Sequence, residues 1–175
     1  MVDMKVAGIG IFDWCWCGRR RIGCGNSSGV PAETKNPKHE NPKMSLRRFI
    51  PSDDCEVEKL EGKSHFWYLK EGLGDSEAFT LVRATITHGS GHPFHTHPEM
   101  DEIIYVLEGE MEQWIEQEKR IVKPGDAVFI PRGVVHGCYN ESNANCTFLA
   151  VLTPGRIKGE FSVDQSQVEP WKSLK

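Results

Sequence analysis

The sequence contains no apolar run long enough to cross a membrane as a helix. Such a helix needs about 18 or more consecutive apolar residues. The apolar run at residues 6–12 ends at Asp13 and lacks the basic region that usually opens a signal peptide. We therefore expect a cytoplasmic protein with no membrane partner.

The sequence also lacks a regular disulfide framework. Its six cysteines are Cys15, Cys17, Cys24, Cys55, Cys138 and Cys146. The first three match no usual zinc pattern, so a metal site there is only the lesser alternative. Cys138 and Cys146 fall in strand-like segments, where buried free thiols are common. This cysteine usage favours a reducing compartment.

Positive charge is scarce in the part of the chain expected to fold. Residues 1–43 carry seven Lys and Arg against four Asp and Glu, a net charge of +3. Residues 44–175 carry the remaining 14 Lys and Arg and 21 Asp and Glu, a net charge of -7. The net charge of the whole sequence is -4. An acidic domain of this kind argues against nucleic acid as the main partner.

The first 43 residues differ in composition from the rest of the chain. Residues 23–43 are rich in Gly, Ser, Asn, Pro and Lys and offer few periodic apolar positions. We expect a flexible N-terminal extension without a helix-turn-helix pattern, or an upstream segment ahead of a start at Met44. Residues 44–155 would then form the folded domain, and residues 156–175 a C-terminal tail.

Strand signals dominate from residue 45 onward, and no long helix or repeat is visible. Residues 79–87 are rich in β-branched side chains and predict a strand. Further short runs between turn signals predict strands at residues 47–50, 65–70, 102–107, 111–116, 119–122, 127–130, 136–139 and 146–152. This regular spacing indicates an all-β sandwich or barrel.

Four of the seven histidines fall within ten residues, and these are His88, His92, His95 and His97. On an extended strand, His95 and His97 would point to the same face. Imidazole is the commonest protein ligand for transition metals. His136 is far enough along the chain to come from a different strand, so the pattern indicates a metal inside a β-structure.

The turn residues and the candidate ligands together resemble the paired motifs of the cupin superfamily. The residues that carry this resemblance are Gly89, His95, His97, Glu102, Gly109, Gly125, Pro131, Gly133, His136 and Asn140. It covers roughly residues 79–152 and implies a small jelly-roll barrel that holds a metal through His95, His97, Glu102 and His136. Asp101 is a neighbouring carboxylate, but only Glu102 stands seven residues before Gly109. The resemblance also implies a homodimer that pairs through barrel edges.

Three imidazoles and one carboxylate suit one divalent transition metal, namely Fe, Mn, Ni, Cu, Co or Zn. On an octahedral ion they leave two open positions for a substrate oxygen, water or O₂. The leading hypothesis is a metal-dependent enzyme, most readily a dioxygenase (an oxidoreductase), acting on a small oxygen-rich substrate. Isomerase, decarboxylase and lyase chemistry stay open, and the alternative is a non-catalytic cupin that binds a small ligand or metal.

Two further residues are candidates for substrate contact or catalysis. His92 breaks the strand parity of His95, so it is either an acid–base group at the rim or an exposed side chain, and we expect the latter. Arg83 either reaches a carboxylate or phosphate of the substrate or lies on an outward face. We expect His88 in a surface turn and Asn140 to stabilise a turn. The aromatic residues expected in the core are Phe94, Trp114, Phe129 and Phe148.

Overall fold

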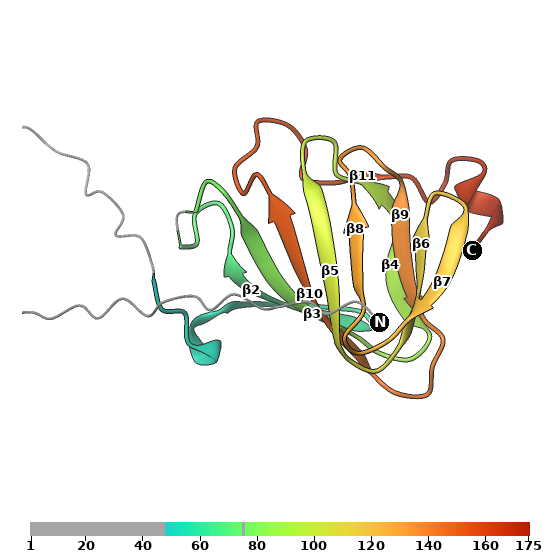
Figure 1. The fold of residues 1–175 in the computed structure, drawn as a ribbon, viewed down its shortest axis with the longest axis horizontal. Helices are drawn as coiled ribbons and strands as arrows, with labels where there is room; N and C mark the ends of the chain where they lie inside the picture. The colour runs from blue at the N-terminus through green and yellow to red at the C-terminus, as the bar shows by residue number, and fades with distance from the viewer. Residues whose placement is uncertain (1–47, 75) are drawn as a thin grey trace, which may run out of the picture. The chain divides into compact units, whose positions relative to one another are not determined.

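The computed structural model describes residues 48–74 and 76–175, which form two antiparallel β-sheets (Figure 1). The six-stranded sheet has the order β1 (Glu56–Leu60), β2 (Lys63–Leu69), β3 (Thr80–Ile86), β10 (Cys146–Thr153), β5 (Asp101–Glu108) and β8 (Ala127–Ile130). The five-stranded sheet has the order β11 (Val163–Asp164), β4 (Ser90–Thr96), β9 (His136–Asn140), β6 (Met111–Ile115) and β7 (Glu118–Val122). The predicted all-β jelly-roll fold is therefore confirmed. The predicted extension at residues 1–43 lies outside the described residues.

Alternation of buried and half-exposed positions explains the strands at the centre of the larger sheet. In β3, Val82, Ala84 and Ile86 are buried, and the residues between them are only half-buried. β10 shows the same period of two and pairs with both β3 and β5. One face of each strand thus lines the interior of the barrel, as the β-branched run at residues 79–87 predicts.

The errors in strand prediction fall in segments that are short or lack alternating apolar residues. The described part of the predicted strand at residues 47–50 forms no strand. The structure instead has β1, whose five residues are all exposed and three of them charged, so no apolar alternation revealed it. β11 was missed as well, because two residues are too short to show any period.

Glycine is required at the turn that ends β5. Gly109 has a φ of +71°, which costs glycine little and other residues more. A Cβ atom at this position would also lie 2.2 Å from the carbonyl oxygen of Asn145. Gly125 and Gly133 have positive φ values too, so the three turn glycines of the predicted motifs are confirmed.

Most of the aromatic residues expected in the core are there. Phe94, Trp114 and Phe148 are buried, but Phe129 is 60% exposed, so that prediction was wrong. Phe129 lies on β8 opposite Ile103 of β5, and both point away from the barrel interior. All four residues of β8 are apolar, so the sequence did not show which face was inward.

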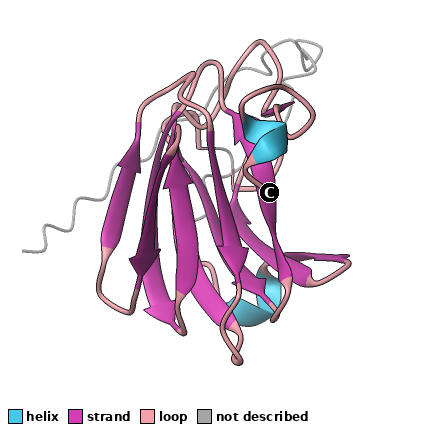
Figure 2. Cartoon of the chain, turned by 90° about the vertical axis from the view of Figure 1, so that its right-hand side faces the viewer, coloured by secondary structure: helices cyan, strands magenta, loops and turns pink. Residues whose placement is uncertain are grey.

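Helical structure is limited to two short 3₁₀ turns in the described ranges, η1 (Ser52–Asp54) and η2 (Trp171–Ser173), as Figure 2 shows. Neither of these described helices has the length or the apolar character needed to cross a membrane.

Candidate metal centre

Three histidines meet inside the barrel. One ring nitrogen from each of His95, His97 and His136 lies within 4.8 Å of the others. His95 and His136 are directly paired across β4 and β9, and His97 follows immediately after β4. The pairing of two strands distant in sequence therefore brings the third imidazole to the first two.

Backbone carbonyls fix the orientation of all three rings. The Nδ1 atom of His95 lies 2.7 Å from the carbonyl oxygen of Pro93, and Nδ1 of His136 lies 3.0 Å from that of Val134. The Nδ1 atom of His97 lies 2.6 Å from the carbonyl oxygen of Phe161. A carbonyl only accepts hydrogen bonds, so each Nδ1 carries the proton. Each Nε2 is thereby left as the ring's possible metal ligand.

Glu102 completes the cluster from the opposite sheet. Its Oε2 atom lies 3.0 Å from Nε2 of His136 and 3.5 Å from Nε2 of His97. When Nδ1 of each imidazole holds its proton, these nitrogens and the carboxylate oxygen face one another as acceptors. A positive charge, either an added proton or a metal ion, is needed between them. This donor set therefore fits a divalent transition metal.

Burial keeps the imidazoles ready to act as ligands. Burial lowers the pKa of His95 to about 4, and the nearby His136 contributes to the shift. Burial also lowers the pKa of His97. Burial on its own would raise the pKa of Glu102, but the close contact with His136 and the other neighbouring histidines keep it below its ordinary value. At neutral pH, His95 and His97 are therefore neutral and Glu102 is ionised.

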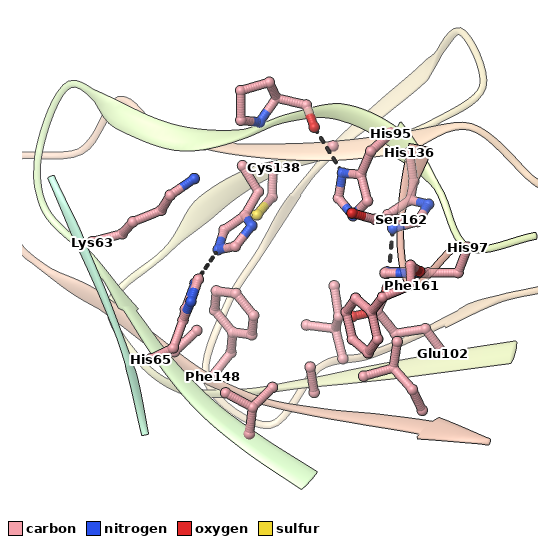
Figure 3. A pocket seen from close by; sticks show the side chains of 18 of the residues that line it. Lys63, His65, His95, His97, Glu102, His136, Cys138, Phe148, Phe161 and Ser162 are labelled. Atoms are coloured by element: carbon pink, nitrogen blue, oxygen red, sulfur yellow. Dashed lines mark hydrogen bonds and ion pairs between the residues drawn. The ribbon is translucent and has the colours of Figure 1, made fainter. Parts of the chain in front are cut away.

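The cluster opens onto a cavity of about 470 Å³. Figure 3 shows His95, His97, His136 and Glu102 on the right of this cavity, and Lys63 and His65 on the left. Much of the wall between them is apolar, and it includes Val82, Ala84, Ile104, Phe148, Ala150 and Leu152. Ile104 lies two residues after Glu102 on β5 and therefore faces the same side of the strand. A small organic molecule could lie with a polar end at the cluster and its body against this wall.

The C-terminal tail contributes a part of the site that the sequence did not reveal. β11 pairs with β4 at Thr96 and His95, which places the preceding Phe161 beside His97. Phe161 supplies the carbonyl for His97, and its ring also packs edge-on against Trp67. A main-chain carbonyl has no sequence signature, so no pattern in residues 156–175 could have indicated this role.

The other predicted site residues take different positions. His92 lines the cavity, contrary to the expectation of an exposed side chain. A register shift between His92 and His95 in the β4–β9 pairing allows both to face inward. Arg83 does not line this cavity and instead stacks over the ring of Phe66, 4.2 Å from its centroid.

Two other placements agree with the sequence analysis. His88 is exposed, and its Nδ1 atom lies 2.6 Å from the carbonyl oxygen of Ser142. Asp101 forms an ion pair of 2.8 Å with Arg132, so its carboxylate binds this guanidinium and does not join the histidine cluster.

Comparison with known proteins agrees with the jelly-roll fold. The family described as "Cupin domain" matches residues 82–152. An uncharacterized protein of Aquifex aeolicus is 42% identical over 115 residues, covering 61% of this chain and 88% of that protein. The chain belongs to the cupin family. The quercetin 2,3-dioxygenase of Bacillus subtilis resembles this cupin at 24% identity over 140 residues, covering 77% of the chain and 41% of that enzyme.

A solved structure shows the same fold. The predicted oxalate decarboxylase of Thermotoga maritima has a TM-score of 0.54 and 25% identity, covering 61% of this cupin and 98% of that chain. A germin-like protein of Arabidopsis thaliana (subfamily 2 member 2) is 33% identical over 89 residues, 48% of this cupin. This cupin spans only 40% of the length of that germin-like protein.

Proposed function

We propose that this cupin holds one divalent transition metal (Fe, Mn, Ni, Cu, Co or Zn) through His95, His97, Glu102 and His136. The observation that carries this proposal is the contact of each of the three Nδ1 atoms with a backbone carbonyl. Three imidazoles donate their Nδ1 protons to carbonyls, and their remaining nitrogens gather beside a buried carboxylate. A group of acceptors assembled in this way needs a cation.

We further propose that this cupin is an enzyme for a small oxygen-rich substrate, with dioxygenase chemistry as the first candidate. A bound metal would polarise the substrate or bring it together with O₂. The apolar wall would orient the substrate and exclude water, and the carbonyl of Phe161 would hold His97 in position. The resemblance to a quercetin 2,3-dioxygenase supports this choice, and that to a predicted oxalate decarboxylase keeps decarboxylation open.

Metal analysis of the freshly purified protein is the first test of the metal site. We expect about one transition metal ion per chain, from one ion per four-ligand site. His97→Ala should lose this metal because its ring is one of the ligands, whereas Cys24→Ala should retain it. Wild-type protein that takes up no metal, even when metal is supplied, would contradict the proposal.

Oxygen uptake across a panel of diols, diketones and carboxylates then tests the reaction. Iron or copper together with O₂ consumption would support a dioxygenase. Bound metal without turnover of any compound in the panel would favour a non-catalytic cupin that binds a small ligand or metal.

We also propose that this cupin forms a homodimer through an edge of the barrel. β8 is the last strand of the six-stranded sheet, and its Phe129 is exposed beside Ile103 of β5. Tyr105 extends the same outward face and is 44% exposed. Apolar side chains that adjoin one another at a sheet edge favour association with a partner of the same kind.

A further inference from the structure

A row of hydrogen-bonded polar side chains lies on the wall of the same cavity, apart from the proposed metal centre. It joins Glu58 of β1, His65 of β2 and His92 of β4. The Nδ1 atom of His65 lies 2.8 Å from Oε2 of Glu58, and Nε2 of His65 lies 2.9 Å from Nε2 of His92. All three residues line the cavity, and none belongs to the proposed metal centre. In Figure 3 the labelled His65 lies across the cavity from His97 and Glu102.

Hydrogen-bond chemistry fixes the order of protons along this row. Glu58 also accepts a hydrogen bond of 3.3 Å from Nε1 of Trp67. Its pKa is lowered, first by the hydrogen bond from His65, so it is a carboxylate that only accepts. Nδ1 of His65 therefore carries a proton toward Glu58, and when this is the only proton on the ring, its Nε2 is bare. The contact of 2.9 Å then requires the proton of His92 to be on Nε2.

This order leaves the Nδ1 atom of His92 as a hydrogen-bond acceptor. Burial lowers the pKa of His92 well below its ordinary value, and the neighbouring Lys63 adds to the shift. The ring thus carries one proton, which is used toward His65. Within residues 48–74 and 76–175, no hydrogen bond engages Nδ1 of His92. The nearby Lys63 donates instead to the carbonyl of Gly91, at 3.2 Å.

His92 stands close enough to the metal centre for one small ligand to reach both. The ring centroids of His92 and His95 are 6.3 Å apart. The ring of His92 also meets Phe148 of the apolar wall edge-on, with a centroid distance of 6.3 Å. A molecule lying on that wall would therefore have the metal centre at one side and His92 at another.

We propose that His92 recognises a hydroxyl or N–H group of the ligand, and that Glu58 and His65 are positioning residues that keep its Nδ1 bare. This inference rests on the proposed function, because it assumes a ligand whose oxygen atoms bind at the metal centre. It deepens that function by making the ligand two-ended. One end carries metal-binding oxygen, and a nearby group donates a hydrogen bond to His92.

The proton arrangement can be measured on the metal-free, full-length protein. Long-range ¹H–¹⁵N correlation spectra distinguish protonated from bare ring nitrogens, and His92→Phe assigns the signals. We expect His92 to be protonated on Nε2 and bare on Nδ1. In Glu58→Leu, His65 loses its acceptor, so its proton can move to Nε2 and that of His92 to Nδ1. A proton on Nδ1 in the wild-type protein, or no change in Glu58→Leu, would overturn the inference.

The ligand class is tested with benzohydroxamate and its three ring-hydroxylated isomers, titrated into zinc-loaded protein by calorimetry. The hydroxamate would chelate the metal, and the isomers present a donor in different directions. At least one isomer should bind about fivefold more tightly than benzohydroxamate, as one added neutral hydrogen bond allows. The gain should vanish in His92→Phe and persist in His88→Phe, which alters an exposed histidine outside the cavity.

The possible failures of this titration have different meanings. If no isomer gains affinity, or if the gain persists in His92→Phe, recognition by His92 is wrong. If benzohydroxamate itself does not bind to the zinc-loaded protein, the proposed chelation at the metal centre fails, and the two-ended ligand fails with it. The proton arrangement in the metal-free protein would still be decided by the spectra.

Discussion

At the scale of single residues, the three imidazoles of the proposed metal centre are oriented by two nearby carbonyls and one that is distant in sequence. His95 and His136 each donate to the carbonyl two residues earlier in their own strand segment, Pro93 and Val134. His97 donates to Phe161, 64 residues away in sequence. Two of the ring orientations are thus set locally, and the third depends on the C-terminal tail.

Asn140 shows how a polar residue of the motif can be structural. It is fully buried, and its Nδ2 atom donates to the carbonyls of Ile86 at 2.9 Å and Ala144 at 2.7 Å. The predicted turn-stabilising role is therefore confirmed. Asn140→Ala should lower the free energy of unfolding by about 1–3 kcal/mol, because it leaves buried carbonyls without donors. Urea denaturation measures this loss, and the exposed Asn143→Ala should change stability by less than about 0.5 kcal/mol.

At the scale of elements, β11 links the tail to the proposed metal centre. Truncation after Glu160 would remove β11 and the Phe161 carbonyl that holds His97. We expect metal affinity to fall by about 10- to 100-fold, as is usual when a partner that orients a ligand is lost. Competition with a chromophoric chelator measures this change.

Truncation after Ser173 is the matched control for this prediction. It keeps Phe161 and β11 but removes Lys175, whose Nζ atom pairs with Glu112 at 2.7 Å and Glu141 at 2.9 Å. Metal affinity should stay near the wild-type value. Equal losses in both truncated proteins would show that the tail acts on stability in general and not through His97.

At the scale of the whole molecule, the proposed metal joins the two sheets. Glu102 comes from the six-stranded sheet, and His95 and His136 come from the five-stranded one. Metal bound only by the folded protein, at 100 times its dissociation constant, should add about 2.7 kcal/mol to the free energy of unfolding. Thermal melts with and without zinc should then differ by about 5–11 °C, and His97→Ala should show no such difference.

The outer face at β8 gives a second prediction at this scale. Phe129→Lys would place a charge within the exposed apolar face that also contains Ile103 and Tyr105. We expect the wild-type protein to be a dimer and the variant a monomer by light scattering after size-exclusion chromatography. Lys119→Gln, which changes an exposed residue of the other sheet, should remain dimeric. A monomeric wild-type protein would contradict the proposed dimer.

The sequence by itself determined the elements whose signals are local. Alternating apolar residues specified strands such as β3 and β10, because successive side chains of a strand point to opposite faces. The candidate ligands His95, His97, Glu102 and His136 were named because the motifs that contain them resemble those of cupins. The spacing within these motifs rejected Asp101, which the structure shows paired with Arg132.

The tertiary structure decided what depends on contacts between distant segments. A register shift in the β4–β9 pairing turned His92 inward, where simple strand parity placed it outside. β1 and β2 brought Glu58 and His65 to His92, and the tail brought the Phe161 carbonyl to His97. Such contacts leave no period or motif in the sequence, because each depends on how separate strands pair in space. The candidate ligands could thus be identified from the sequence. The carbonyls that hold the Nδ1 protons of the three histidines could be identified only in the folded barrel.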